Sequence, residues 1–233
     1  MLTEPLPRRC AAELVGTLLL VLAVVGSGIA ATRLSTDVGV QLLINAAATA
    51  GALLAVISAL GAVSGAHLNP VVSLVDRARG GLSPREALAY AGAQVAGALL
   101  GVAAAHAIWS APLHLGTRSR GGAAAFLSEV LATAGLVLVV VGVSRARSGA
   151  SAPLAVAGYI GGAYFFTSST SFANPAVTVA CALTDTFTGI EPADAALFVL
   201  AQLVGAGVGA VAAHVIFGDD RTPVVVAPAE VTT

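Results

Sequence analysis

Long apolar segments alternate with short polar ones along the whole chain. A helix that crosses a bilayer needs about 20 consecutive, mostly apolar residues. Six segments meet this requirement, at about residues 11–31, 39–62, 86–109, 122–143, 150–167 and 194–217. Two further apolar runs, at about 69–78 and 174–184, are too short to cross. The pattern therefore predicts an all-α membrane protein with six transmembrane helices and two short apolar helices.

Each short run begins with the same dipeptide, at Asn69-Pro70 and at Asn174-Pro175. Proline suits the first turn of a helix, where its missing N–H is no loss, and it keeps the residue before it out of the helical region. We therefore expect two half-helices that begin abruptly at their asparagines. A single Asn-Pro would more often be a simple helix break in a packed bundle. Two of them, at corresponding places in the chain, favour a pore formed by both half-helices.

The two halves of the chain repeat each other. The segment AQVAGALLGVAAAHAIW at 93–109 recurs as AQLVGAGVGAVAAHVIF at 201–217, and the half-helix starts recur 174 − 69 = 105 residues apart. Each half then holds three spans, an odd number, so the second half must be inverted relative to the first. We expect one channel domain over 11–217, with repeats at about 11–115 and 120–217, between an N-terminal segment 1–10 and a tail 218–233.

Composition places the chain in a bilayer. Hydrophobic residues make up 57% of the chain and charged residues only 10%, with a mean hydropathy of +0.92; soluble domains carry about 25% charged residues. The net charge of −1 gives no reason to expect a nucleic-acid partner. Cys10 and Cys181 suggest packed small residues rather than a disulfide framework. We expect no metal and no cofactor, because the four histidines lack ligand spacing, and no enzyme, because no nucleophile–base pair is present.

The arginines are distributed unevenly between the two sides of the predicted bundle. Eight of the eleven cationic residues fall on the side that holds both termini, and three, Arg33, Arg118 and Arg120, fall on the other. Cytoplasmic loops carry the excess of positive residues. The first apolar run is too long for a signal peptide. We therefore expect a retained first span and cytoplasmic termini.

The two half-helices have an electrostatic consequence. In an inverted repeat they enter from opposite faces and meet at their N-termini, each of which carries about half a positive charge. Irregular backbone at that depth is tolerated only where it lines a cavity or is buried in protein. The arrangement predicts a pore with asparagine amide donors in its lumen. Such a pore accepts neutral solutes with oxygen acceptors and repels cations and protons.

The motifs SGAHLNPVVSL and FANPAVTVA resemble the paired Asn-Pro-Ala signatures of the aquaporin and aquaglyceroporin family, and the resemblance covers about residues 10–217. The first motif departs from it by reading Asn-Pro-Val. The resemblance implies a homotetramer in a bacterial cytoplasmic membrane, with one passive pore for small neutral solutes in each subunit. The pore residues that it implies are Asn69, Pro70, Val71, Asn174, Pro175 and Ala176, with the backbone of Gly65, Ala66 and His67.

The same resemblance assigns the buried polar residues of the spans. It implies that Glu13, Glu129, Gln94 and Gln202 brace the two loops that precede the half-helices. Carboxylates inside a membrane are costly and are usually functional or paired. The alternative is a proton relay in a coupled transporter, in which Glu13 or Glu129 titrates.

The family's narrow filter is a ring of four positions. Counting from the asparagines by the family's spacing places them at Thr49, Gly162, Ser171 (or Phe172, if the loop differs) and Val177. Most of the family has arginine at the last position and an aromatic residue or histidine in the ring. Their absence here predicts a wide, uncharged filter. The valine form also resembles a bacterial subgroup that is associated with arsenic resistance genes.

These features predict a channel for glycerol, arsenite or methylated arsenicals, and water. A mainly water-selective channel is the alternative, with Phe165, Phe166 or Phe172 refilling the filter. A proton-coupled transporter is the third reading.

Overall fold

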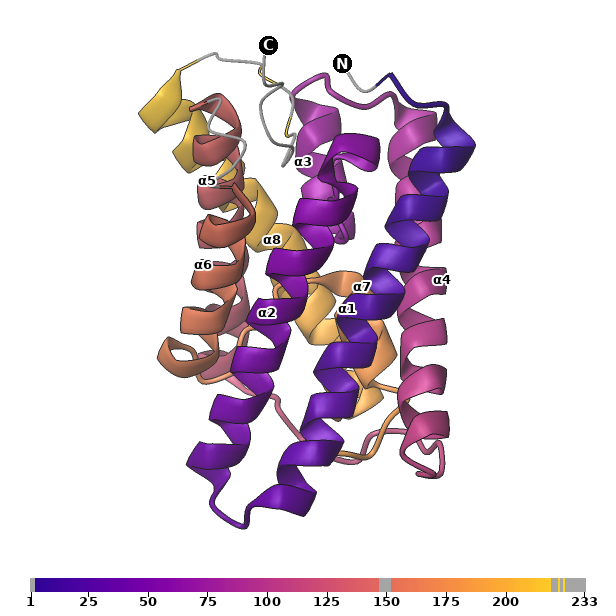
Figure 1. Cartoon of the computed structure of the whole chain (residues 1–233). Coiled ribbons are helices and arrows are strands. Elements are labelled where there is room, and N and C mark those ends of the chain that lie inside the picture. Colours follow the sequence, from indigo (N-terminus) through magenta and orange to yellow (C-terminus); the bar gives the residue numbers. More distant parts are fainter. Residues whose placement is uncertain (1–2, 147–151, 219–221, 223, 225–233) are drawn as a thin grey trace.

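A computed structural model of the chain describes residues 3–146, 152–218, 222 and 224. Within these residues the protein is a bundle of eight helices without strands (Figure 1). The first half comprises α1 (Leu6–Leu34), α2 (Val38–Ser64), α3 (Pro70–Ala78) and α4 (Pro84–Ile108). The second comprises α5 (Ala123–Arg145), α6 (Ala152–Phe166), α7 (Pro175–Cys181) and α8 (Pro192–Phe217).

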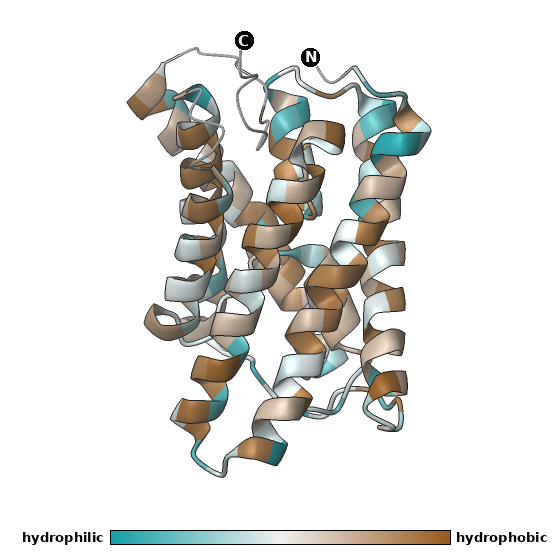
Figure 2. Cartoon of the chain, viewed as in Figure 1, coloured by the Kyte–Doolittle hydropathy of each residue, from teal (hydrophilic) through white to brown (hydrophobic). Residues whose placement is uncertain are grey.

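Five of the helices, α1, α2, α4, α5 and α8, are long and apolar enough to cross a membrane. The sixth predicted span, 150–167, corresponds to α6, whose described part begins at Ala152 and has 15 residues. Apolar residues predominate along the middle of the bundle and polar residues gather at its ends (Figure 2). The predicted all-α membrane fold is confirmed, with five described helices long enough to cross and α6 in the place of the sixth span.

The two short helices begin inside the bundle, at the predicted prolines. Asn69 and Asn174 are their N-caps, with extended backbone at φ −156° and −154°. Each asparagine Oδ1 accepts a hydrogen bond from a first-turn N–H, of Val71 in α3 and of Ala176 in α7, at 3.0 Å in both. The cap satisfies a donor that the start of a helix leaves unpaired. A helix can therefore begin in mid-bundle without water.

The repeat in the sequence is also a repeat in the packing. Helix α1 packs along α4, and α5 packs along α8. Glycines allow the close approach: a Cβ on Gly97 would lie 2.2 Å from the Leu14 carbonyl oxygen, and one on Gly205 would lie 2.5 Å from that of Val130. The two glycines are 108 residues apart, the offset of the repeated segment, and their partners are 116 apart, as Glu13 and Glu129 are.

The structure describes parts of the two predicted terminal segments, 1–10 and 218–233. Helix α1 begins at Leu6, five residues before the predicted first span. Its beginning and the end of α8 lie at the same end of the bundle (Figure 1). Of the predicted tail 218–233, the structure describes Gly218, Thr222 and Val224, and the rest of that prediction lies outside the described residues.

Candidate functional site

A cavity of about 200 Å³ lies between the two halves of the bundle. Both capping asparagines border it, together with the loops that precede them. Its walls are mainly apolar, from Leu20, Val24, Leu42, Leu53, Ile57, Val72, Leu136, Val140, Val156 and Ile160. Water occupies about 30 Å³ per molecule in the liquid, so the cavity has room for several waters or one small solute.

The two asparagines tie the halves together. Asn69 Nδ2 donates to the carbonyl oxygen of Ala173, and Asn174 Nδ2 donates to that of Leu68, each at 2.8 Å. One N–H of each amide is therefore engaged across the repeat. The second N–H has no partner among the described residues, and both asparagines border the cavity. Each asparagine therefore has one amide N–H for the lumen, where the sequence suggested both.

The loops before the half-helices hold an unusual backbone. Ala66 and Leu68 have φ of 47° and 52°, and their counterparts 105 residues later, Ser171 and Ala173, have φ of 52° and 47°. A left-handed conformation costs a non-glycine residue about 1–2 kcal/mol. Such residues persist only where their surroundings hold them in place.

Two buried carboxylates provide that hold. Glu13 accepts four hydrogen bonds at 2.6–3.0 Å, from Ser64 Oγ, His67 N, Leu68 N and Gln94 Nε2. Glu129 accepts the equivalent four at 2.6–2.9 Å, from Ser169 Oγ, Phe172 N, Ala173 N and Gln202 Nε2. Each glutamine also donates to the adjoining half-helix, Gln94 to Ser73 and Gln202 to Thr178. The four residues thus join each loop to its half-helix and two spans.

The same geometry bears on the proton-relay alternative. Glu13 and Glu129 are fully buried and do not border the cavity. All four partners of each carboxylate are hydrogen-bond donors, so its oxygens serve here only as acceptors. The carboxylates are therefore positioned to hold loops rather than to exchange protons with the cavity.

Three of the four predicted filter positions border the cavity. Thr49, Ser171 and Val177 are buried side chains in its wall, on α2, the second loop and α7. Phe172, the alternative to Ser171, also borders it. The oxygen Oγ of Ser171 is buried and has no hydrogen-bond partner among the described residues.

The fourth position, Gly162, requires a correction. Gly162 is exposed, and a Cβ built on it would meet only the Phe166 ring, at 3.8 Å. Ile160 and Tyr164 border the cavity instead. Two residues along an α-helix turn by about 200°, so position 162 faces away from the side that 160 and 164 share. Counting back from Asn174 selected the wrong face of α6.

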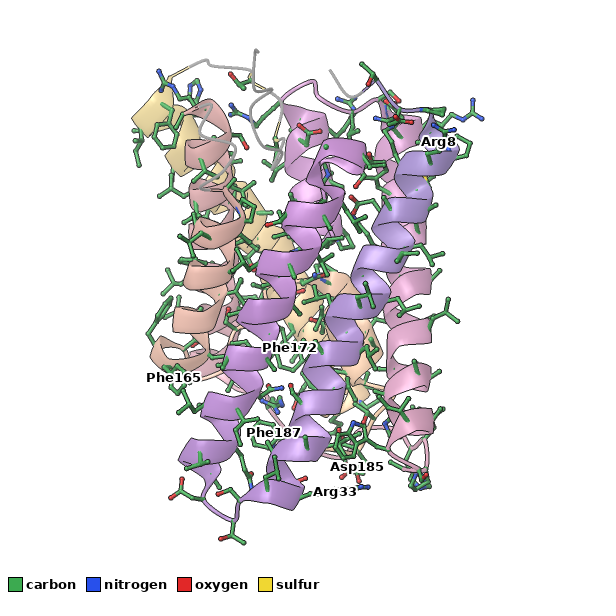
Figure 3. All side chains as sticks on the ribbon, viewed as in Figure 1. Arg8, Arg33, Phe165, Phe172, Asp185 and Phe187 are labelled. Atoms are coloured by element: carbon green, nitrogen blue, oxygen red, sulfur yellow. The ribbon has the colours of Figure 1, made fainter. Side chains whose placement is uncertain are left out.

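Tyr164 places an aromatic ring in the cavity wall. Its hydroxyl lies 3.0 Å from Thr49 Oγ1, which joins α6 to α2 at the cavity wall. The prediction of a ring without an aromatic side chain is thereby corrected. Phe165 and Phe166, proposed as alternative fillers, are 54% and 62% exposed and do not border the cavity. Figure 3 shows Phe165 at the outside of the bundle and Phe172 within it.

Comparison with known proteins shows which family the chain resembles in sequence and in fold. The family model for the major intrinsic protein matches residues 2–172. The aquaglyceroporin AqpS of Rhizobium meliloti is 48% identical over 202 residues, which cover 86% of each chain. The chain belongs to the major intrinsic protein family. Aquaporin Z of Brucella melitensis is 29% identical over 91% of this chain and 99% of its own. The crystallographic aquaglyceroporin structure from Plasmodium falciparum shares the fold, with a TM-score of 0.63 at 21% identity, covering 95% of this chain and 99% of that one.

As a member of the family, the protein is a multi-pass membrane channel rather than an enzyme. The cavity is the candidate for its pore. His67 borders this pore next to the first half-helix. Its N–H is held by Glu13, and its ring nitrogens lie 3.1 Å from Ser73 Oγ and 3.0 Å from the Val224 carbonyl oxygen. The His67 ring is thus tied to the end of the chain as well as to the half-helix.

Several pore residues were not expected from the sequence. Cys181 is fully buried and borders the pore one turn after Val177, on the same face of α7. Four more come from irregular segments at one end of the pore: Arg118, Arg120, Phe187 and Thr188. Helical spacing from Val177 would have found Cys181, whereas loops have no periodicity from which the other four could be inferred.

Proposed function

We propose that this channel passes small uncharged solutes down their gradients: glycerol, arsenite or methylated arsenicals, and water. The observation that carries the proposal is the character of the pore lining. Apolar side chains form most of the wall, and the polar side chains of Thr49, Ser171, Asn69 and Asn174 border the same cavity. A polyol has a hydrocarbon side and a hydroxyl side, so it suits a wall that offers both.

Two further points support this solute class. None of the described residues that line the pore is Asp or Glu, so no carboxylate is present there to bind a cation. The relative from Rhizobium meliloti is named an aquaglyceroporin, which supports a solute of glycerol type. The proposal that arsenicals pass rests on the sequence resemblance. Arsenite also resembles glycerol chemically, because it is compact, uncharged and carries hydroxyl groups.

A mainly water-selective pore is the second candidate, and Tyr164 is the observation that favours it. A tyrosine hydrogen-bonded to Thr49 narrows a ring that the sequence predicted to be wide. Val177 acts in the opposite direction, because it is shorter than the arginine that the family usually has there. The two candidates differ only in the size of the solute that they exclude.

We also propose a homotetramer in the cytoplasmic membrane of a bacterium, with both termini in the cytoplasm. Arginines support the orientation. Arg8, Arg9, Arg77, Arg79, Arg85 and Arg145 belong to helix ends at one end of the bundle, and Arg33, Arg118 and Arg120 belong to the other. Figure 3 shows Arg8 and Arg33 at opposite ends. We call the Arg33 end the outer end.

Stopped-flow light scattering on proteoliposomes tests the proposal with a series of water, urea, glycerol and arsenite. We expect glycerol and arsenite permeabilities clearly above those of protein-free liposomes. Val177→Trp, which fills the pore from α7, is the matched control and should abolish the increase. Water flux without glycerol flux would favour the water-selective candidate. An unchanged permeability for every solute would disprove the channel proposal.

A further inference from the structure

The segment 110–122, between α4 and α5, lies over the outer end of the pore and is firmly anchored there. Gly116 N donates to the Ala182 carbonyl oxygen at 2.9 Å. Thr117 donates to Asp185 through its backbone N–H at 3.0 Å and its hydroxyl at 2.8 Å. These bonds hold the pKa of the Asp185 carboxyl below its ordinary value, so it stays ionised as an acceptor. Figure 3 shows Asp185 and Phe187 toward the outer end.

The anchoring continues up to Arg120. Its backbone N–H donates to Asp194 Oδ2 at 2.7 Å, and the hydroxyl of Ser119 donates to the same oxygen at 3.0 Å. Asp194 belongs to the first turn of α8. The backbone of Arg120 is therefore fixed to a transmembrane helix, independently of what its side chain does.

The guanidinium of Arg120 lies against the loop that forms the filter. Its Nε donates to the Gly189 carbonyl oxygen at 2.8 Å, and its Nη2 donates to that of Phe187 at 2.9 Å. Its Nη1 lies 3.4 Å from Thr170 Oγ1. Its central carbon stands 5.3 Å from the centre of the Phe172 ring, a cation–π arrangement. Thr170 and Phe172 flank Ser171, so the charge stands beside the predicted filter.

The guanidinium retains hydrogen-bonding capacity. Arginine has five N–H donors, and the three contacts above use three of them. Arg120 borders the same pore as Val177, Ser171 and Thr188. Two guanidinium N–H groups thus have no partner among the described residues.

The charge of Arg120 is not compensated by an ion pair. Among the described residues, the ion pairs join Arg8 to Glu4 and Arg9 to Glu86, with a histidine contact from His67 to Asp76. The neighbouring Arg118 adds a second positive charge at the same end. Burial, and then Arg118, lower the pKa of Arg120, as expected for a cation without a counter-ion.

The geometry points to Arg120 as the cationic filter residue of this channel, supplied by the loop between α4 and α5 in place of the arginine that position 177 lacks. It selects uncharged solutes with oxygen acceptors and repels cations. Because the charge comes from the loop rather than from α7, the pore beside Val177 keeps the space of a short side chain. A permissive pore and a charged barrier can then coexist. This inference rests on the proposed function, a channel for neutral solutes.

The test compares the permeabilities of glycerol, water and methylammonium in proteoliposomes. The variants are Arg120→Gln and Arg120→Met, which are uncharged, and Arg120→Lys, which keeps the charge. Arg33→Gln is the matched control, because Arg33 is at the same end but does not border the pore. A unit charge about 10 Å from a passing cation, at an effective dielectric constant of about 20, changes its population on the order of tenfold.

We expect methylammonium permeability to rise on the order of tenfold in both uncharged variants, with water permeability within about twofold of wild type. Arg120→Lys and Arg33→Gln should exclude methylammonium as the wild type does. If the uncharged variants still exclude it, the half-helices alone form the barrier and the inference is wrong. Loss of water flux in both uncharged variants would also overturn it, because Arg120 would then only hold the loop. A wild type that passes no glycerol contradicts the proposed function instead.

Discussion

Val177 and Tyr164 border the same pore from α7 and α6. Both are buried, and Tyr164 is held by its hydrogen bond to Thr49. A short aliphatic side chain on one wall thus stands in the same cavity as a fixed aromatic ring on another. Substitution at either position should change the size of the largest solute that passes. A longer side chain at 177 should lower that size, and a shorter one at 164 should raise it.

Val177→Arg should lower glycerol flux by about tenfold, equivalent to about 1.4 kcal/mol in the barrier, and lower water flux much less. A long side chain at position 177 narrows the pore, and this obstructs the larger solute more than water. The charge of Arg120 also repels the new guanidinium and directs it into the lumen. Stopped-flow measurement of both solutes checks this result. Val177→Met, of similar length but uncharged, separates bulk from charge. Equal losses of water and glycerol flux would show that position 177 does not discriminate by size.

Tyr164 and Gly162 offer a paired test of which face of α6 lines the pore. Tyr164→Ala should widen the constriction and raise glycerol flux relative to water flux. Gly162→Ala should change neither, because the nearest atom to an added Cβ is on the exposed Phe166, at 3.8 Å. Permeability ratios for the two variants decide the matter. An effect of Gly162→Ala on flux with Tyr164→Ala inert would reverse the assignment.

At the scale of elements, each half-helix depends on one buried glutamate. Glu129→Gln replaces an acceptor oxygen by an NH₂ group, which must then face one of four donors. Leaving a buried donor unpaired costs about 1–3 kcal/mol. We expect a lower thermal midpoint of the detergent-solubilised protein together with reduced glycerol flux.

The matched control for that variant is Glu191→Gln, at an exposed N-cap that makes no side-chain cap bond, and it should leave both properties unchanged. Glu13→Gln should behave as Glu129→Gln does, because the two carboxylates have equivalent partners. Normal stability of Glu129→Gln combined with loss of pH-driven uptake would favour the coupled transporter.

Local signals explain which elements could be predicted from the sequence. The half-helices are evident because proline after asparagine starts a helix, and the long helices because they are apolar throughout. The face of α6 is not evident, since an apolar helix of 15 residues has no polar stripe to orient it. Arg120 could not be placed either: the segment 110–122 has no periodicity, and its position depends on contacts with residues about 70 positions later.

At the scale of the whole molecule, the arginines make the two ends of the bundle unlike. Six described arginines belong to the Arg8 end and three to the Arg33 end. Two of the three, Arg118 and Arg120, border the pore. The orientation in the membrane therefore determines whether a solute that enters the cell or one that leaves it meets these charges first.

A fusion to the C-terminus tests that orientation. Because basic residues are retained on the cytoplasmic side, a C-terminal green fluorescent protein should fluoresce in bacterial cells, and a C-terminal alkaline phosphatase should be inactive. Replacing Arg8, Arg9 and Arg145 by glutamine should weaken the preference, whereas glutamine at Arg33 should strengthen it. An active phosphatase fusion to the unaltered chain would invert the molecule. The barrier formed by Arg120 would then guard the cytoplasmic mouth, and solutes leaving the cell would meet it first.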